Sequence, residues 1–273
     1  MELQEKKAEF ERNGLKVASV SYDSVEILKS FADRAGITFP MLADPDSKII
    51  RDFGILNESI PKGNPTYGVP YPGSYILDGR GIVQSKYFTL DYRERYTGGD
   101  ILMDRSSGAG LTGWKEIETP HLRVRYRASD EIVRAGNHVV LRLEVSLKPK
   151  MHVYAPEVQG NYIPVQWQMA EGAWKSSPPQ WPASKNIHLK VINETLPVYK
   201  DRFVVTRDVV LAQQKELAAA AGAAKEMALE GTFRYQACDD KVCYPPVNIP
   251  LKWNLRVGEL DMQRVPEALR RRK

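Results

Sequence analysis

The spacing of apolar residues along the chain changes near residue 105. Before that point, apolar positions recur with a helical period in some segments and form short β-branched runs in others. The predicted elements are a helix over residues 2–13, a strand over 15–22, a helix over 25–36, a strand, a turn and a helix over 37–55, a β-hairpin over 73–90 and a helical stretch over 91–104. This alternation of helices and strands predicts an α/β fold for the first part of the chain.

Beyond residue 114, short segments alternate apolar with polar positions and are separated by Pro, Gly and Asn, which is the pattern of half-buried strands. These segments cover residues 121–129, 138–147, 151–156, 163–169, 202–212, 231–238 and 247–257. They predict an antiparallel β-sandwich whose core or edge takes up the tryptophans. The tryptophans are Trp114, Trp167, Trp174, Trp181 and Trp253. Residues 213–231, rich in Ala, Lys and Glu, predict instead a short helix or a flexible excursion.

A Gly- and Ser-rich stretch at residues 105–114 is the predicted linker between two domains. The first domain covers residues 1–104, the second covers residues 115–258, and a basic tail covers residues 259–273. A chain of 273 residues is long enough to hold both domains.

The charge pattern limits the partners of the chain. The net charge of +5 comes from 39 basic and 34 acidic residues that are interspersed. The one dense basic cluster, at residues 270–273, reads as a solvated end, so we expect no nucleic-acid partner. No run of about eighteen apolar residues occurs, so we expect no membrane span. The charged residues 1–14 lack the apolar centre of a signal peptide.

Residues 3–55 and 67–83 resemble the peroxiredoxin-like (AhpC/TSA) branch of the thioredoxin superfamily, which implies a thioredoxin-like fold. The resemblance puts Pro72 at the position of the family's cis-proline. It also puts the family's first strand and its peroxidatic cysteine ahead of this sequence. Because residues 1–104 contain no cysteine, we expect no thiol nucleophile here. We expect either a truncated reading frame or a repurposed scaffold, with a gap in the sheet where the central strand is missing.

Both cysteines, Cys238 and Cys243, lie in the segment FRYQACDDKVCYPP. Strand-like residues flank a tight turn at residues 239–242, which brings the two Cα atoms within bridging range, about 4.4–6.8 Å. A bridge that closes so short a loop removes little unfolded-state entropy, which disfavours a structural staple. The alternatives are a redox-active pair, a stabilising hairpin disulfide without turnover, or part of a metal site.

A metal site is the weakest of these alternatives. Structural zinc usually takes four ligands, and no second cysteine pair exists. The histidines are scattered over the predicted strands and are expected to be ordinary side chains: His121, His138, His152 and His188. We therefore expect neither a metal nor a cofactor.

Residues around the cysteine pair are expected to shape the site. Lys241 favours a thiolate, whereas Asp239 and the aspartate after it oppose one, so the direction of the thiol pKa shift stays open. Tyr235 and Tyr244 either shield the sulfur atoms or are plain strand aromatics. Pro245 stiffens the chain after the turn, because it has no amide hydrogen to donate.

The segment YQACDDKVCYPP resembles the redox motif of the N-terminal, immunoglobulin-like domain of the thiol:disulfide interchange protein DsbD. Supporting segments lie at residues 148–157, 181–184 and 196–205. The resemblance spans residues 115–257 and implies an antiparallel immunoglobulin-like β-sandwich in an extracytoplasmic (periplasmic) location. It assigns the two redox roles to Cys238 and Cys243.

In that family the domain accepts electrons from a membrane partner and passes them to other extracytoplasmic thiol proteins. A cap loop with an aromatic residue shields the cysteine pair in its better-known members. The corresponding residues 185–199 contain no phenylalanine. Whether Tyr199 or His188 takes its place stays open.

The fold class predicted from the sequence is α/β plus all-β: a truncated thioredoxin-like domain followed by an immunoglobulin-like β-sandwich. The predicted function is a thiol–disulfide oxidoreductase that passes electrons through Cys238 and Cys243 to and from thioredoxin-like or membrane thiol–disulfide exchange proteins. The redoxin half is expected to have no activity of its own in this chain. In a full-length version, the sandwich would re-reduce a neighbouring peroxidatic cysteine. The alternative is a non-enzymatic extracytoplasmic interaction module with a structural hairpin disulfide.

Overall fold

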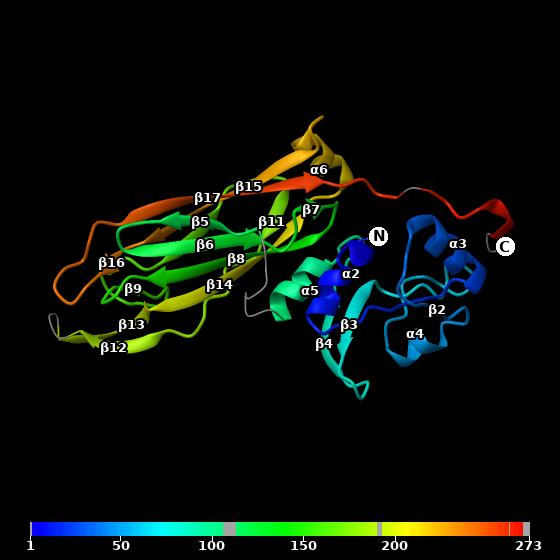
Figure 1. The fold of residues 1–273 in the computed structure, drawn as a ribbon, viewed down its shortest axis with the longest axis horizontal. Helices are drawn as coiled ribbons and strands as arrows, with labels where there is room; N and C mark the ends of the chain where they lie inside the picture. The colour runs from blue at the N-terminus through cyan, green and yellow to red at the C-terminus, as the bar shows by residue number, and fades with distance from the viewer. Residues whose placement is uncertain (1, 106–112, 190–192, 262, 270–273) are drawn as a thin grey trace. The chain divides into compact units, whose positions relative to one another are not determined.

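The computed structural model describes residues 2–105, 113–189, 193–261 and 263–269. Its internal contacts divide the chain into two compact units (Figure 1). The first unit is Met1–Asp104 together with Glu259–Lys273, and the second is Arg105–Gly258. Most of the predicted linker and the whole basic cluster at residues 270–273 lie outside the described residues. This division groups Glu259–Lys273 with the first unit, so a separate basic tail from residue 259 remains a prediction.

The first unit consists mainly of short elements. They are α1 (Glu2–Glu5), α2 (Lys7–Arg12), β1 (Ser19–Ser21), α3 (Val25–Ala35), β2 (Met41–Ala43), α4 (Lys48–Asp52), β3 (Gly73–Leu77), β4 (Val83–Phe88), α5 (Gly98–Arg105) and the 3₁₀ turn η1 (Glu267–Leu269). The best-defined of them is α3, where Ser24 Oγ accepts a hydrogen bond from the Ile27 amide and Gly36, at φ 63°, ends the helix. The helix predicted over residues 2–13 is interrupted between α1 and α2.

The described strands of the first unit form two short sheets that do not join. β1 pairs in parallel with β2, and β3 pairs antiparallel with β4. Val20 and Leu42 are directly paired between β1 and β2 and remain 42% and 50% exposed. The discontinuity predicted for this sheet is therefore present in the described residues. A small core is built on Phe10, Ile101 and Leu102, from α2 and α5.

The prediction of a cis peptide bond at Pro72 is wrong, because the described residues contain no cis peptide bond. Pro72 directly precedes β3 and is only half-buried. An X–Pro bond favours the trans form by about 0.5–1 kcal/mol unless the surrounding structure holds the cis form. A half-buried ring offers little such enclosure.

The second unit is a β-structure with one described helix. Its elements are β5 (Lys115–Glu118), β6 (Leu122–Ala128), β7 (Ile132–Val133), β8 (His138–Leu147), β9 (His152–Tyr154), β10 (Gln166–Met169), β11 (Trp174–Ser176), β12 (Lys185–Leu189), β13 (Glu194–Lys200), β14 (Arg202–Leu211), α6 (Gln214–Ala221), β15 (Glu226–Tyr235), β16 (Ala237–Cys238) and β17 (Val247–Val257). Every strand segment predicted from the sequence contains a strand. The strands that were not predicted are β5, β7, β11, β12 and β13.

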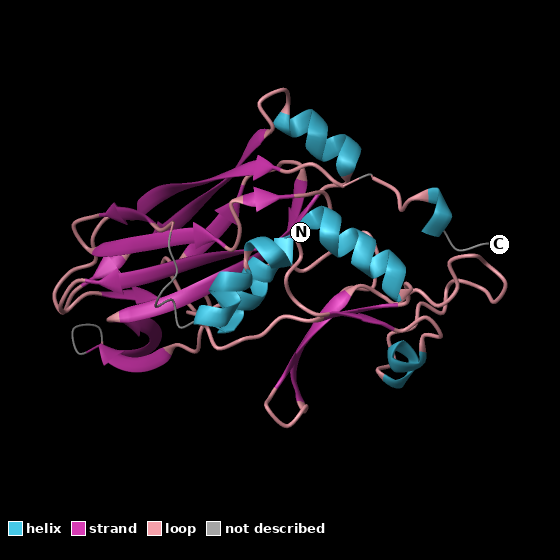
Figure 2. Ribbon diagram, turned by 45° about the vertical axis from the view of Figure 1, so that its right-hand side comes forward, coloured by secondary structure: helices cyan, strands magenta, loops and turns pink. Residues whose placement is uncertain are grey.

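Two sheets of this unit face each other across one core, which confirms the predicted sandwich (Figure 2). Their strand orders are β11-β14-β8-β6-β5 and β10-β15-β17-β7. The side-chain period of two decides which residues fill the core: Leu122 and Val124 from β6 meet Ile249 and Leu251 from β17. Burying one such aliphatic side chain contributes about 1.5–3 kcal/mol. This core makes the sandwich a firm support for the strands at its end.

Four of the five tryptophans fill or edge this core, as predicted. Trp167 and Trp253 are buried in it, and Trp174 and Trp181 pack against it. Trp114 lies under the Arg125 guanidinium, whose carbon is 4.6 Å from the ring centroid.

A third sheet, in the order β12-β13-β9-β16, lies at one end of the second unit, at the left of Figure 1. Its strands β9 and β13 are paired through Tyr154 and Val198, both buried in a small cluster that also contains Cys238. The sheet thus positions the first of the two cysteines.

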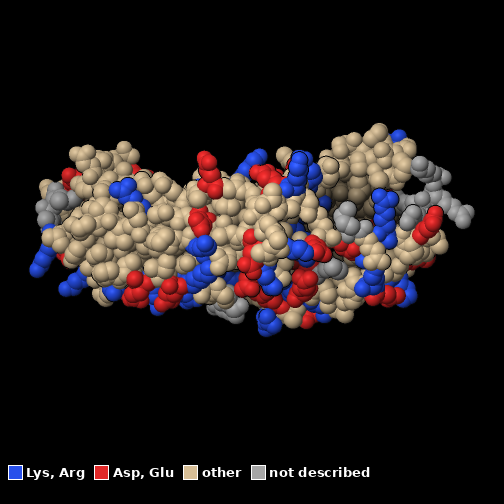
Figure 3. Space-filling view, turned by 90° about the horizontal axis from the view of Figure 1, so that it is seen from above, with Lys and Arg blue, Asp and Glu red and all other residues tan. Residues whose placement is uncertain are grey.

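The surface carries charges of both signs. Basic and acidic side chains are interspersed on the face seen in Figure 3. Among the described residues, no helix has the length and apolar composition needed to cross a membrane.

Candidate redox site

Cys238 is held by strand pairing. It ends β16, which runs antiparallel to β9 with Cys238 opposite His152 and Ala237 opposite Val153. β9 is in turn paired with β13 on its other side. The backbone of Cys238 is therefore fixed by a sheet, and its side chain is only 1% exposed.

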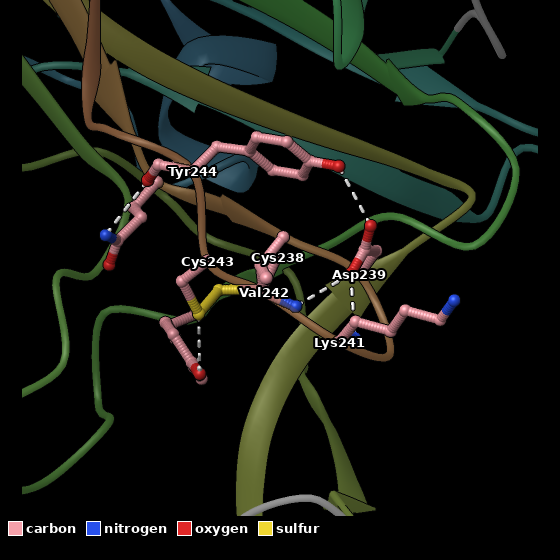
Figure 4. The surroundings of a disulfide bond; sticks show 8 residues. Cys238, Asp239, Lys241, Val242, Cys243 and Tyr244 are labelled. Carbon is pink, nitrogen blue, oxygen red and sulfur yellow. Dashed lines mark hydrogen bonds between the residues drawn. A yellow bond between two sulfur atoms is a disulfide. The ribbon is translucent and has the colours of Figure 1, made fainter.

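The turn after Cys238 is organised by one carboxylate. Asp239 Oδ1 accepts hydrogen bonds from the amides of Lys241 (2.7 Å) and Val242 (2.9 Å), and the Asp239 amide donates to the Val242 carbonyl (3.0 Å) (Figure 4). An aspartate that binds the amides after it stabilises a tight turn. The turn directs Cys243 back towards Cys238.

The two sulfur atoms form a disulfide bond of 2.01 Å, and the Cα atoms are 4.0 Å apart. That separation is slightly below the range expected from the sequence. The Tyr244 amide donates to the Ala237 carbonyl at 2.8 Å, which closes the hairpin on the far side of the bridge. The bridge therefore spans a narrow hairpin that is hydrogen-bonded both inside and outside the cysteine pair.

The two cysteines differ in exposure. Cys243 is exposed to solvent, whereas Cys238 is buried. The Tyr154 hydroxyl lies 3.7 Å from Cys243 Sγ, within reach of a weak O–H···S hydrogen bond. Cys243 is thus the cysteine that a visiting thiolate can approach, while Cys238 is enclosed by the protein.

Tyr244 braces the turn. Its hydroxyl donates to Asp239 Oδ2 at 2.9 Å, and its ring packs on His121 with centroids 4.6 Å apart. The hydrogen bonds from the Val242 and Lys241 amides, followed by the one from Tyr244, lower the pKa of Asp239. The carboxylate of Asp239 therefore stays ionised and is used by the turn itself.

The disulfide lies at the wall of a groove of about 480 Å³. The groove is lined by His152, Tyr154, Ile187, His188, Leu189, Lys200, Cys238, Asp239, Asp240, Lys241, Val242 and Cys243. These residues come from β9, from the β12–β13 pair and from the cysteine turn. His188 therefore lies in the stretch expected to cap the site and reaches the groove, as one of the two candidates for the missing aromatic.

Tyr199, the other candidate, does not line the groove. Its ring stacks on Phe203 with centroids 4.4 Å apart, its hydroxyl donates to the Pro182 carbonyl at 2.8 Å, and burial raises its pKa to about 12. The reason is strand parity: Lys200, which follows Tyr199, shares the groove face with His152, so Tyr199 points to the core face with Val153.

Tyr235 is also a core residue rather than a shield for the sulfur atoms. It is completely buried, and its hydroxyl donates to Thr119 Oγ1 at 2.9 Å. Burial raises its pKa. Pro245 is exposed just after the pair, and Lys241 is an exposed residue of the turn. Of the two tyrosines weighed from the sequence, only Tyr244 touches the cysteine turn.

His152 is the residue that the sequence reasoning missed. It is 2% exposed, directly opposite Cys238, and neither of its ring nitrogens has a hydrogen-bond partner among the described residues. Burial, and then the charge of Lys200, lower the pKa of His152, against the opposing effects of Asp240 and Asp239. The sequence signal was its place in the segment 148–157, but the pairing of β9 with β16 could not be read from it.

No group of three or more His, Cys, Asp or Glu side chains within the described residues is arranged to hold a metal ion.

Two family models match the chain. Residues 1–86 match the AhpC/TSA family, and residues 123–249 match the N-terminal domain of the thiol:disulfide interchange protein DsbD. The chain thus has a segment similar to the AhpC/TSA family followed by one similar to the DsbD N-terminal domain, and the cysteine hairpin lies within the second match.

Curated relatives match about a third of the chain. A candidate peroxiredoxin of Mycobacterium tuberculosis is 35% identical over 80 residues, which is 29% of this chain and 50% of the relative. Alkyl hydroperoxide reductase C of Staphylococcus aureus is 31% identical over 94 residues, or 33% of this chain and 46% of the relative. The chain spans about half the length of the curated relatives it matches.

Solved structures match at lower identity. The N-terminal periplasmic domain of ScsB from Proteus mirabilis is 18% identical, with a TM-score of 0.37 over 53% of this chain and 50% of that chain. The reduced N-terminal domain of DsbD from Neisseria meningitidis is 13% identical, with a TM-score of 0.27 over 41% of this chain and 74% of that chain.

Proposed function

We propose that the chain is a thiol–disulfide oxidoreductase that carries two electrons on the Cys238–Cys243 pair. The observation that carries the proposal is the unequal exposure of the two cysteines across a narrow, hydrogen-bonded hairpin. An exposed sulfur admits a partner, and a buried neighbour that stays in place can resolve the intermediate. The match of residues 123–249 to the DsbD N-terminal domain supports the same chemistry.

The direction of attack follows from exposure. A partner thiolate attacks Cys243 Sγ, a bond forms between the two proteins, and the Cys238–Cys243 bond breaks with its electron pair left on Cys238 Sγ. A second thiolate on the partner then attacks the partner's own sulfur in the mixed disulfide and releases Cys243 as a thiolate. The partner is oxidised to its disulfide, and this chain is reduced by two electrons. Delivery to an acceptor disulfide runs the same steps in reverse.

The redoxin segment has a different place in this proposal. Residues 1–104 contain no cysteine, so no thiol peroxidase step is assigned to them in this chain. The partners we propose are thioredoxin-like or membrane-bound thiol–disulfide exchange proteins. An extracytoplasmic location is proposed by analogy with the DsbD N-terminal family and with the ScsB domain, which is described as periplasmic.

A trapping experiment tests the roles of the two sulfurs. The single-thiol variants Cys238→Ser and Cys243→Ser are each incubated with oxidised glutathione, and the mixed disulfide is followed by mass spectrometry. Cys238→Ser, which keeps the exposed thiol, is expected to form the adduct at least about tenfold faster than Cys243→Ser. Equal rates would contradict the assignment of Cys243 as the sulfur that meets the partner.

A reduction potential separates this function from the alternative, a module whose disulfide only fixes a loop. A value clearly above about −300 mV indicates a labile, exchanging pair, and a value below it indicates a structural bridge. Wild-type protein that fails to exchange with dithiothreitol or reduced thioredoxin would leave the structural role in its place.

A further inference from the structure

His152 occupies the position on β9 that directly faces Cys238. The register pairs His152 with Cys238 on one side and with Lys200 on the other. Directly opposed residues of antiparallel strands project to the same face, with Cβ atoms about 4.5–5.5 Å apart. Both His152 and Cys238 also line the groove. The imidazole therefore lies beside the buried sulfur atom.

The oxidised state leaves this imidazole without a hydrogen bond. Both ring nitrogens are buried and have no partner among the described residues. Buried polar groups of native proteins are nearly always hydrogen-bonded, and an exception points to a partner supplied by another state or to a chemical role. A disulfide sulfur has no hydrogen to donate and is a weak acceptor. A thiol donates, and a thiolate is a strong acceptor.

We propose that His152 is a positioning and proton-holding residue for Cys238: unpartnered and neutral while the disulfide is intact, and hydrogen-bonded to the Cys238 sulfur once that bond is broken. This inference rests on the proposed function, since it concerns the sulfur that leaves when a partner attacks Cys243.

The proton balance of the step is as follows. Attack on Cys243 Sγ moves one electron pair onto Cys238 Sγ, which leaves as a thiolate. The imidazole takes one proton from the solvent of the groove and shares it with that thiolate. His152 and Cys238 together therefore gain one electron pair and one proton. When Cys238 later attacks the mixed disulfide in the reverse direction, the proton returns to the groove. The ring is neither oxidised nor reduced.

Charged and titratable groups face His152 from each neighbouring element. They are Lys200 on β13, Tyr154 on β9, and Asp239, Asp240 and Lys241 in the cysteine turn. Lys200 opposes a proton on the imidazole and favours a thiolate on Cys238. Asp239 is engaged by the turn amides and Tyr244. A negative charge that appears on Cys238 is therefore the change that raises the pKa of the His152 imidazole.

The test compares the ring of His152 in two redox states. The full chain is labelled with ¹⁵N-histidine, and the ring nitrogens are followed by NMR against pH, first oxidised and then reduced with a phosphine. The ring signals are assigned with His152→Gln. On reduction, the pKa of His152 is expected to rise by about one unit or more, with a new hydrogen-bond shift on one ring nitrogen. The same titration in both states would overturn the inference.

Kinetics provide a second readout. The rate of reduction by dithiothreitol is measured against pH for wild type, His152→Gln and the control His138→Gln, a histidine of β8 that does not line the groove. His152→Gln is expected to slow reduction by about tenfold and to remove an inflection from the pH profile, while His138→Gln leaves both unchanged. An unchanged profile in a folded His152→Gln protein would overturn the inference.

The two proposals fail in different ways. If a phosphine reduces the wild-type disulfide but thiols do not exchange with it, the electron-carrier function is contradicted. The titration of the His152 ring in the two redox states then decides the role of His152 by itself. If His152→Gln does not fold, the wild-type titration alone decides, with the ring signals assigned from the remaining histidine variants.

Discussion

The two units of this chain differ in how completely their sheets are built. In the described first unit, β1–β2 and β3–β4 remain separate sheets, and the core is a small cluster around Phe10. In the second unit, two sheets close over one continuous core that includes Leu141 and Phe233. The redox pair lies in the second unit, where strand β16 fixes the backbone of Cys238.

The difference shows what a thiol site needs from its scaffold. Cys238 is held by a ladder to β9 and then to β13, and Cys243 follows a turn closed by Asp239. A cysteine pair keeps its bridging distance only if both backbones are fixed. The strands of the first unit contain no cysteine and include exposed apolar residues such as Val20 and Leu42. Stability and chemistry are thus predicted to be concentrated in the second unit.

The largest effect expected from this comparison is that of Phe233→Ala. Phe233 is completely buried in β15, the strand that leads into β16. Its loss should lower the free energy of unfolding of the second unit by about 3–5 kcal/mol, and disulfide reduction by dithiothreitol should change because β16 loses its support. The matched variant Phe10→Ala should loosen only the first unit. Amide exchange in each unit and the rate of disulfide reduction are measured for both variants. If Phe10→Ala changed the reduction rate as much as Phe233→Ala, the contrast between the two units would be contradicted.

Glycines at close approaches provide a smaller, matched pair. A Cβ added at Gly231 would lie 2.6 Å from the carbonyl oxygen of Gln168 on the paired strand β10, so the backbone would have to move. A Cβ at Gly73 would meet the Phe88 ring at 2.2 Å, and a side chain can rotate away. Gly231→Ala should destabilise its unit by about 1–3 kcal/mol, more than Gly73→Ala does. Urea unfolding followed by amide exchange measures both, and the reverse ranking would contradict this account.

Much of the second unit could be predicted from the sequence because its strands alternate cleanly. β6 and β17 bury residues in alternation, and a period of two is visible locally. The parallel pairing of β7 with β17 depends on contacts between distant segments. No local pattern contains that information.

The same limit explains the site. The cysteine spacing and the aspartate after Cys238 predicted a tight, bridged turn, because both features are local. The sides on which Tyr199 and Tyr235 lie depend on strand parity relative to the core, so the sequence left open whether they shield the sulfur atoms. His152 could not be recognised, because its importance comes from its register with Cys238. Local chemistry was predictable, and cross-strand neighbours were not.

Asp239→Ala should affect the site more than the fold. It removes the acceptor for two turn amides and for Tyr244, so the reduced hairpin opens and the dithiol form is favoured by roughly threefold to tenfold. Redox equilibration with glutathione measures this shift. The neighbouring variant Asp240→Ala should leave the equilibrium unchanged; an equal shift would show that the turn is not held by Asp239.

The same carboxylate gives a pH signature. The pKa of Asp239 is lowered from its ordinary value of 3.8, so its contribution to stability is present above about pH 4 and is lost as the pH falls through the lowered folded-state value. The difference in urea midpoint between wild type and Asp239→Ala should therefore shrink below that pH. A difference that stays constant down to strongly acidic pH would contradict the role of the ionised carboxylate.

The smallest effect is expected at the start of α3, in the first unit. Ser24 Oγ accepts the Ile27 amide at 3.4 Å, a long hydrogen bond, so Ser24→Ala should fall near the lower end of the usual capping effect of about 0.5–2 kcal/mol. Ser24→Asp keeps a capping acceptor and serves as the control. Faster amide exchange confined to α3, with an unchanged reduction rate at Cys243, is the expected result. Because the redox pair is anchored through β9 and β13, a change in its reduction rate would mean that the first unit contributes to the site after all.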